Sequence, residues 1–348
     1  MGLRFILLPF SWLFGFIAQC RWILFDKGVL KRKQSTLPTI VVGNIKVGGT
    51  GKSPMILLLI EELIKEGYTL AVLSRGYGRE TKGFLEVFTS LSAVQCGDEP
   101  LMIKKRFPDV VVTVCENRVA GVSQIATLFP KTQVILLDDA FQHFRLKASL
   151  YILLTEWQHP FYRDFPMPTG MLREFRSAAY RADIIITTKA PVNVNEKVKS
   201  EHCQHIRRYS NAMQFFSAIE YLLPMNITTT QTISWDEVVG RGAVLVTGIA
   251  NPNLIVNYLN DKKVPFKHFK FSDHAHLSEQ QVSEITQFAR STNQIVLTTE
   301  KDAARIPTEW LDGGIWFILP MSNSIESKDE LIQKLKSVIS PAKSSGNS

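Results

Sequence analysis

One segment near the N-terminus constrains the fold more than any other. Residues 39–53 read TIVVGNIKVGGTGKS, an apolar β-branched run followed by a loop with three glycines and then by Lys-Ser. The run predicts a buried strand, and apolar residues recur at helical spacing over 55–67. Pro54 falls in the expected first turn of this helix, where its missing N–H costs nothing. Strand, glycine loop and helix in this order predict an α/β sheet whose first loop binds an anion.

The loop has the composition of a phosphate-binding loop. Glycines let successive backbone N–H groups point at one anion. Lys52 adds a positive charge for the outer phosphates, and the Ser53 hydroxyl suits magnesium. Lys46 stands where the usual pattern has glycine, and a purely structural turn is the alternative. We predict a nucleoside triphosphate site made of Lys46, Val47, Gly48, Gly49, Thr50, Gly51, Lys52 and Ser53.

The chain continues to alternate between strands and helices. Strands are expected at residues 39–42, 70–74, 110–114, 134–137 and 184–187, with helices between them. Near-continuous apolar strands of this kind predict a phosphate-loop NTPase-type parallel sheet with helices on both faces. Ligands of such sheets bind beyond the carboxyl ends of the strands. A second alternation, with strands in 243–252, 265–271 and 295–299, predicts a smaller C-terminal α/β domain.

These patterns divide the 348 residues into successive parts. We expect a membrane-associating segment at 1–35, a phosphate-loop kinase domain at 36–205, a linker at 206–240, the smaller domain at 241–339 and a disordered tail at 340–348. The linker is expected because its residues are poorly patterned. Its threonine-rich stretch, 227–233, is expected to be extended.

The first 35 residues indicate contact with a membrane. Residues 5–20 carry no charge, the first 25 residues are rich in Phe and Trp, and a cluster of Lys and Arg follows. Aromatic residues flanked by basic ones are typical of a helix in the bilayer interface. The run is short for a spanning helix and contains Pro9 and Gly15. We expect membrane attachment, with a slight preference for the interface over a spanning helix and with a buried core helix as the alternative. The basic cluster is expected to keep the rest of the chain in the cytoplasm.

Composition narrows the class of partner. Hydrophobic residues make up 45% of the chain and charged residues 21%, as in globular proteins, and the net charge of +8 suits an anionic partner. The basic residues are dispersed without a recognition motif, so no nucleic-acid partner is expected. The four scattered cysteines indicate a reducing compartment rather than a disulfide framework.

Acidic residues follow two of the expected elements. Asp138 and Asp139 end an apolar strand, where they are suited to hold magnesium or its waters, and a helix N-cap pair is the alternative. Asp98 and Glu99, in GDEP, read by themselves as a capped turn.

Basic residues lie on other expected loops. Arg75, in SRGYGR, and Arg173, in LREFR, are either phosphate contacts or solvated charges. In FSDHAH, Asp273, His274 and His276 suit a metal pair or a proton transfer. The segment TTEKDAARI reads equally as a helix cap and as a nucleotide or domain contact.

The motifs VGNIKVGGTGKSP, LSRGYGR, GDEP, LDDAFQH, LRE, TGIANP, SDHAH and TTEKDA stand in this order. Together they resemble the tetraacyldisaccharide 4′-kinase family, the lipid A 4′-kinases of Gram-negative bacteria, whose loop is also of the GGxGK type. The resemblance runs to about residue 320. It implies transfer of the ATP γ-phosphate, with Mg²⁺, to the 4′-hydroxyl of a membrane glycolipid, tetraacyldisaccharide 1-phosphate, giving lipid IVA. It also implies location at the cytoplasmic face of the bacterial inner membrane.

The resemblance also assigns roles to residues. It implies Asp98 as the base, assisted by His274 from the second domain. Lys52 would then steady the phosphates, while Ser53 and one of Asp138 and Asp139 hold Mg²⁺. The expected substrate-binding residues are Arg75, Gln142, His143 and Arg173. The rival hypothesis is a membrane-associated phosphate-loop ATPase or GTPase that acts as a switch or positioning factor, which needs only an oriented water and neither Asp98 nor His274.

Overall fold

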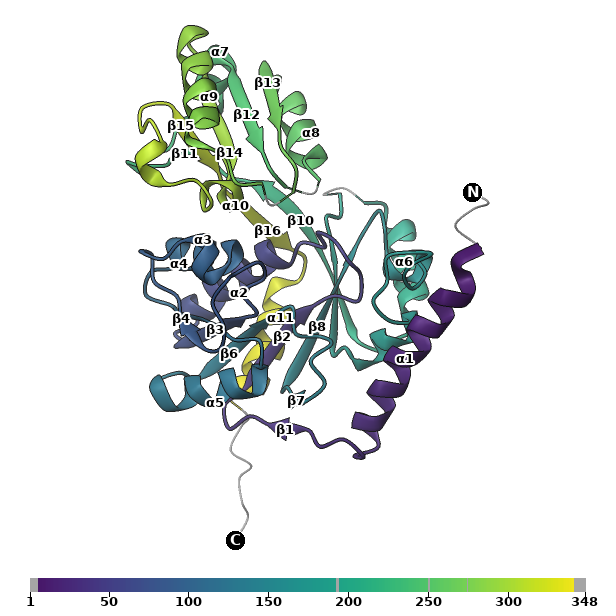
Figure 1. The fold of residues 1–348 in the computed structure, drawn as a ribbon. Helices are drawn as coiled ribbons and strands as arrows, with labels where there is room; N and C mark the ends of the chain where they lie inside the picture. Colours follow the sequence, from purple (N-terminus) through teal and green to yellow (C-terminus); the bar gives the residue numbers. More distant parts are fainter. Residues whose placement is uncertain (1–5, 192–193, 250, 274, 341–348) are drawn as a thin grey trace.

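A nine-stranded sheet forms the body of the larger domain (Figure 1). Its strand order is β16-β10-β9-β8-β2-β6-β3-β5-β4, and all neighbours pair in parallel except the two edge strands, β16 and β4. The strands are β2 Thr39–Gly43, β3 Leu70–Ser74, β4 Leu85–Glu86, β5 Val111–Val114, β6 Val134–Asp138, β8 Leu150–Glu156, β9 Ile184–Thr188, β10 Met213–Tyr221 and β16 Met321–Ile325. The five strands expected in this region are all present, with ends within one residue of the expectation.

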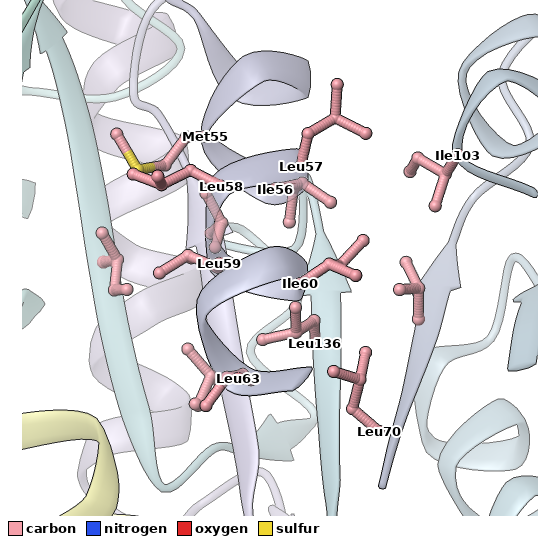
Figure 2. Close-up of a cluster of buried hydrophobic side chains, with 14 of the residues drawn as sticks. Met55, Ile56, Leu57, Leu58, Leu59, Ile60, Leu63, Leu70, Ile103 and Leu136 are labelled. Atoms are coloured by element: carbon pink, nitrogen blue, oxygen red, sulfur yellow. The ribbon is translucent and has the colours of Figure 1, made fainter. Parts of the chain in front are cut away.

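Helices cover both faces of this sheet, as predicted. They are α2 Lys52–Lys65, α3 Ala93–Cys96, α4 Asp98–Arg106, α5 Arg118–Leu128, α6 Glu196–Arg207, α11 Lys328–Ile339 and the 3-10 helices η2 Phe161–Arg163 and η3 Arg176–Arg181. Side chains alternate along β2: Ile40 and Val42 join the core under α2 and α11, whereas Val41 joins the core on the opposite face. Helix α2 is buried almost all round, because it packs against the strands, α4 and α11 (Figure 2).

A five-stranded sheet of order β11-β15-β14-β12-β13 forms the smaller domain, with β11 antiparallel and the other strands parallel. The strands are β11 Met225–Asn226, β12 Ala243–Thr247, β13 Phe266–Lys270, β14 Ile295–Thr299 and β15 Trp316–Leu319. The helices are α7 Trp235–Arg241, α8 Asn253–Asp261, α9 Glu279–Ser291, α10 Glu300–Ala303 and the 3-10 helix η4 Thr308–Trp310. Helices α7 and α8 pack on one face and α9 on the other, so this domain also has two layers of core.

The domain boundaries differ from the expected ones. The expected linker, 206–240, contains β10, which pairs with β9 and is integral to the large sheet. Residues 321–339, expected in the smaller domain, form β16 and α11, and both return to the larger domain. The threonine-rich stretch is not extended: the Asn226 side chain accepts hydrogen bonds from the N–H groups of Thr228 and Thr229 and folds it into a turn.

Helix α1, Leu8–Asp26, lies along the larger domain with one face against it (Figure 1). Its buried residues are Ser11, Gly15, Trp22 and Phe25. The Ser11 hydroxyl donates a hydrogen bond of 2.7 Å to Oγ1 of Thr169. A Cβ atom on Gly15 would lie 2.6 Å from the Phe175 ring, so glycine permits this close packing. A short parallel pair, β1 Lys33–Gln34 with β7 Leu146–Lys147, follows the helix.

The opposite face of α1 exposes large apolar side chains. They are Phe10, Trp12, Leu13, Phe14, Phe16, Ile17, Ile23 and Leu24. The helix is continuous from Leu8 to Asp26: it passes through Gly15, and Pro9 lies in its first turn, where proline is tolerated. Among the residues that the structure describes, α1 alone is long and apolar enough, by length and composition, to cross a membrane.

The structure, a computed structural model, describes residues 6–191, 194–249, 251–273 and 275–340. The expected base partner, His274, and all of the expected tail except Ser340 lie outside these residues.

Candidate active site

The glycine-rich loop joins β2 to α2 and has the geometry of a phosphate cradle. Gly48 and Gly51 have φ values of +111° and +82°, in a region that side chains rarely adopt. A Cβ atom added at Gly48 or Gly49 would meet nothing within 4 Å, so this side of the loop faces open space. Helix α2 begins at Lys52, and its positive N-terminal end faces the same loop. The loop is therefore suited to bind the phosphates of a nucleotide.

Neighbouring strands hold the loop in place. The Thr50 hydroxyl accepts a hydrogen bond of 2.5 Å from Nδ2 of Asn44, and its carbonyl accepts one of 2.9 Å from the Thr188 hydroxyl. The Gly49 carbonyl accepts one from Nζ of Lys189. These contacts tie the loop to the ends of β2 and β9, so its shape is preorganised.

The side chain of Lys46 is directed elsewhere. Its Nζ lies 3.3 Å from a carboxylate oxygen of Asp164 and donates to the His159 carbonyl at 3.2 Å. A cavity of about 620 Å³ adjoins this ion pair, lined by Lys46, Gln158, His159, Pro160, Arg163, Asp164, Pro168, Thr169, Gly170 and Met171. Although Lys46 was expected to bind the nucleotide, its side chain is committed to this cavity, and only its backbone belongs to the loop.

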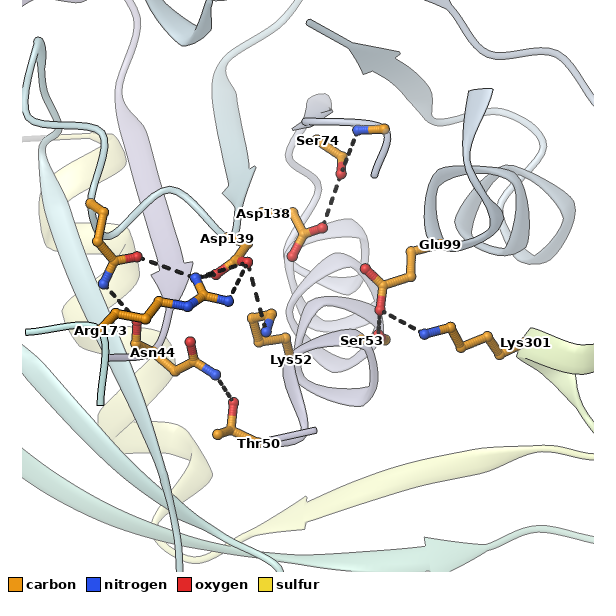
Figure 3. Close-up of polar contacts among 12 residues, drawn as sticks. Asn44, Thr50, Lys52, Ser53, Ser74, Glu99, Asp138, Asp139, Arg173 and Lys301 are labelled. Carbon is orange, nitrogen blue, oxygen red and sulfur yellow. Dashed lines mark hydrogen bonds and ion pairs between the residues drawn. The ribbon is translucent and has the colours of Figure 1, made fainter. Parts of the chain in front are cut away.

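The two acids at the end of β6 have different partners (Figure 3). Asp138 is buried and accepts a hydrogen bond of 3.0 Å from Ser74. Burial, together with the nearby carboxylates of Glu99 and Asp139, raises the pKa of Asp138 to about 7. Asp139, at a φ of +46°, instead pairs with Arg173 at 3.2 Å and with Lys52 at 3.9 Å. The sequence alone did not indicate which of the two acids would contact the metal.

Glu99 was expected only to cap a turn, but it reaches the phosphate loop. The Ser53 hydroxyl donates a hydrogen bond of 2.8 Å to Oε1 of Glu99, and Nζ of Lys301 lies 3.5 Å from the same oxygen (Figure 3). Ser53 lies in the first turn of α2, Glu99 in the first turn of α4, and Lys301 in α10. The contact depends on tertiary structure, so the position of Glu99 beside Asp98 was its only sequence signal.

Asp98, the expected base, is the first residue of α4 and is buried. Its Oδ2 accepts hydrogen bonds from Nε and Nη2 of Arg305, at 2.9 and 2.5 Å. Nη1 of Arg305 donates to the Gly248 carbonyl and to Asp302, both at 3.0 Å. The TTEKDAARI segment thus provides both a helix cap, at Thr299, and a domain contact. Sequence analysis did not identify Arg305.

Gln142 braces the loop. Its Nε2 donates to the Asn44 carbonyl and to Glu174, both at 2.9 Å, while its Oε1 accepts from Arg173 at 3.4 Å. Glu174 forms a buried bidentate pair with Arg181, at 2.7 and 2.8 Å. The expected substrate residues Gln142 and Arg173 therefore belong to one network with Asp139.

His143 lies in a positively charged environment. Burial, together with the positive charges of Arg118, Arg21, Arg145 and Arg75, lowers the pKa of His143 to about 4. Within the described part of the chain, its buried Nε2 has no hydrogen-bond partner. Arg75 is exposed on the loop after β3. A neutral imidazole among arginines is suited to receive an anion.

The donor set of the loop fits magnesium better than a soft metal. Within the described ranges, no group of three or more His, Cys, Asp and Glu residues is arranged to hold a metal by itself. Ser53, Asp138 and Glu99 instead offer hard oxygen donors. The Glu99 carboxylate is close enough to Asp138 to raise its pKa. Mg²⁺ is usually held by one or two carboxylates together with phosphates and waters. A cation here would offset the crowding of negative charge.

Comparison with known proteins identifies the family of this chain. The family model described as Tetraacyldisaccharide-1-P 4′-kinase matches residues 3–340. The tetraacyldisaccharide 4′-kinase of Flavobacterium psychrophilum is 38% identical over 334 residues, which are 95% of each chain. That of Flavobacterium johnsoniae is 38% identical over 343 residues, covering 97% of this chain and 99% of the relative.

A solved structure extends the agreement to the fold. The crystal structure of LpxK from Aquifex aeolicus in complex with ATP has a TM-score of 0.76 and 28% sequence identity, and the match covers 97% of this chain and 99% of that one. The match supports the predicted phosphate-loop fold, and the family match extends over nearly the whole chain. The chain therefore belongs to the tetraacyldisaccharide 4′-kinase family, the kinases of lipid A biosynthesis.

Proposed function

We propose that this kinase transfers the γ-phosphate of ATP to the 4′-hydroxyl of tetraacyldisaccharide 1-phosphate, giving lipid IVA. The observation that carries the proposal is the contact between Ser53 and Glu99, which brings the first turn of α4, and with it Asp98, to the phosphate-binding end of α2. A phosphate loop joined to a buried carboxylate suits transfer to a hydroxyl acceptor. A hydrolytic switch requires neither this carboxylate nor a second domain docked on it.

Phosphoryl transfer depends mainly on positioning and on neutralising charge. The N–H groups of the loop and Lys52 bind the phosphates. Asp98 accepts the proton of the 4′-hydroxyl, and an ordinary carboxylate suffices because proton transfer to the base can be late in a loose transition state. His274 assists Asp98 from the smaller domain.

Ser53 and Asp138 are the residues that would hold Mg²⁺. Asp139 is already paired with Lys52 and Arg173, whereas Asp138 is buried beside a second carboxylate. The ion would neutralise charge on the β- and γ-phosphates.

The glycolipid substrate carries a phosphate, and arginine side chains near the site offer positive charge to bind it. Arg75 and the arginines around His143 are suited to its phosphate. Gln142 and Arg173 bind substrate from the network that also holds Asp139.

Helix α1 attaches the kinase to the cytoplasmic face of the inner membrane. One of its faces packs on the larger domain, so lipid cannot surround the helix as it surrounds a spanning segment. The other face presents Phe, Trp, Leu and Ile side chains to the surroundings. This geometry suits a helix that lies in the bilayer interface, and Lys and Arg after it suit anionic lipid.

The decisive experiment incubates the detergent-solubilised protein with γ-labelled ATP, Mg²⁺ and tetraacyldisaccharide 1-phosphate. Label is expected in a bis-phosphorylated glycolipid, and Asp98→Asn is expected to abolish this while ATP still binds. Steady phosphate release without labelled lipid would instead support the rival switch function.

A further inference from the structure

Three ion pairs join the larger domain to residues 300–305 of the smaller one. Helix α10 provides Glu300 and Lys301, which pair with Arg106 at 2.9 Å and with Glu99 at 3.5 Å. Arg305, which follows α10, pairs with Asp98. All three partners lie on α4, and Figure 1 shows α10 at the edge of the smaller domain that faces this helix.

The smaller domain fixes Arg305 before it reaches Asp98. Thr299 caps α10, accepting a hydrogen bond from the N–H of Asp302 at 3.0 Å and donating to its carboxylate at 2.7 Å. Asp302 and the Gly248 carbonyl in turn hold Nη1 of Arg305. The Arg305 side chain is only 2% exposed, so it has little freedom to adopt another orientation.

The carboxylates of Asp98 and Glu99 are stabilised by the positive charges of Arg305 and Lys301. They are adjacent carboxylates on the first turn of α4, and Glu99 also lies near buried Asp138. Repulsion among these charges would move α4 away from the phosphate loop. The positive charge of Arg305 compensates the carboxylate of Asp98. The positive charge of Lys301 compensates the carboxylate of Glu99, which also accepts the Ser53 hydrogen bond.

We propose that Lys301 and Arg305 are positioning residues for phosphoryl transfer. Arg305 orients the carboxylate of Asp98 toward the acceptor hydroxyl, and Lys301 holds Glu99 against Ser53. The smaller domain thereby sets the geometry at both ends of the transfer, the acceptor base and the phosphate loop. The inference rests on the proposed role of Asp98 as the base.

The third ion pair provides a matched control. Glu300 and Arg106 belong to the same interface, but Arg106 lies in the last turn of α4, away from Ser53 and Asp98. Glu300→Gln keeps one acceptor oxygen, at the Oε2 position that accepts from both Arg106 and the N–H of Met321, and it removes the charge. It therefore weakens domain docking without altering the site.

The test compares Lys301→Met, Arg305→Lys and Glu300→Gln in the full chain, by label transfer to the glycolipid and by thermal unfolding. Lys301→Met and Arg305→Lys are expected to lower kcat by about 10- to 100-fold with a nearly unchanged KM for ATP, since each removes or weakens one charge-assisted contact. Arg305→Lys keeps the charge but loses the fork that grips Asp98. Glu300→Gln is expected to lower Tm as much as Lys301→Met and Arg305→Lys do, but to leave kcat nearly unchanged. Lys301→Arg is expected to restore most of kcat.

A double-mutant cycle separates positioning from general stability. If Lys301 acts through Glu99, Lys301→Met adds no further loss of kcat in a Glu99→Gln background. Additive losses would overturn the proposal, and so would equal losses of kcat in all three interface variants. Lys301 is 22% exposed, so its variant remains informative if Arg305→Lys fails to fold.

Asp98→Asn in the same assay keeps the two proposals apart. Normal turnover in this variant would refute Asp98 as the base. An inactive Asp98→Asn, combined with Lys301→Met and Arg305→Lys that behave like Glu300→Gln, would refute the positioning role alone.

Discussion

The Ser53 hydroxyl donates its hydrogen bond to Glu99 at 2.8 Å, and this contact fixes the direction of its two lone pairs. A hydroxyl has one hydrogen to donate, so donation to Glu99 leaves both lone pairs available on the side away from the carboxylate. Glu99 therefore prepares Ser53 to act as a ligand for a cation. The contact also links the first turns of α2 and α4, the elements that carry Lys52 and Asp98.

Lys52→Ala is expected to lower kcat/KM for ATP by about 10- to 100-fold, because it removes the loop cation that faces the phosphates. Lys46→Ala is the control, since the Lys46 side chain pairs with Asp164 instead. Steady-state kinetics with varied ATP measure both. Equal effects, or an unchanged rate in Lys52→Ala, would refute the assignment of the loop.

Asp138→Asn is expected to stabilise the fold at neutral pH by roughly 1–3 kcal/mol while activity is lost, because it removes a buried charge near two other carboxylates. Asp139→Asn is the matched change, and it is expected to give no stabilisation because Asp139 already pairs with Arg173 and Lys52. Urea unfolding at neutral pH compares them. A destabilised Asp138→Asn would show that its burial is already compensated.

His143 is expected to make stability fall as the medium becomes acidic. The pKa of His143 is lowered to about 4 in the fold, from 6.5 in its ordinary state. Between these values the unfolded chain binds a proton that the folded chain does not, so the free energy of unfolding decreases as pH falls from 6.5 toward 4. Urea unfolding across this range should show a shallower decrease in His143→Gln. An identical slope in the variant would contradict the expectation.

Trp12→Ser combined with Phe16→Ser is expected to weaken binding to vesicles with anionic lipid by about 10²- to 10⁴-fold, because each aromatic ring inserted in the bilayer contributes about 1.5–3 kcal/mol. The control is Leu128→Ser, which removes an exposed apolar side chain at the end of α5. Co-sedimentation measures the effect. Deletion of residues 1–25 should release the protein altogether, and continued sedimentation would indicate another lipid-binding surface.

Glu174→Gln is expected to destabilise the fold by about 3–5 kcal/mol, because it leaves the Arg181 guanidinium buried without its counterion. The two side chains are only 4% and 5% exposed. Glu196→Gln removes one partner of Lys199 at the surface, leaves the pair with Glu326, and should change stability by less than about 0.5 kcal/mol. Thermal unfolding of both variants tests the contrast, which would be absent if the buried pair were dispensable.

Local patterns predicted five of the nine strands of the large sheet, because these five are largely buried on both faces and so consist of continuous apolar residues. The central strand β8 was missed although it is also largely buried. Strand β10 was missed because only part of its length is buried and because its apolar and polar residues do not alternate regularly. Strand β16, MSNSI, is an antiparallel edge strand with few apolar residues. A sequence read locally cannot show that these two segments, 100 residues apart, pair with each other.

Some residues of the candidate site could likewise be predicted from local sequence, and others could not. The phosphate loop and the acids of β6 follow from neighbouring residues in the chain. The partners Glu99, Lys301 and Arg305 come from three segments that only the fold brings together. Their motifs were visible in GDEP and TTEKDAARI, but a short charged motif carries no information about its counterion.

The pairing of β10 with β16 has a consequence for how the two domains are connected. Tyr221 lies opposite Met321 at the end of an antiparallel ladder, so residues 222–320 emerge and return at one point. The smaller domain is in effect the tip of an enlarged β-hairpin. Its two connections leave side by side, which permits it to tilt on a short stem but restricts sliding or twisting over the larger domain. A tight turn from Tyr221 to Met321 would close the large sheet without it.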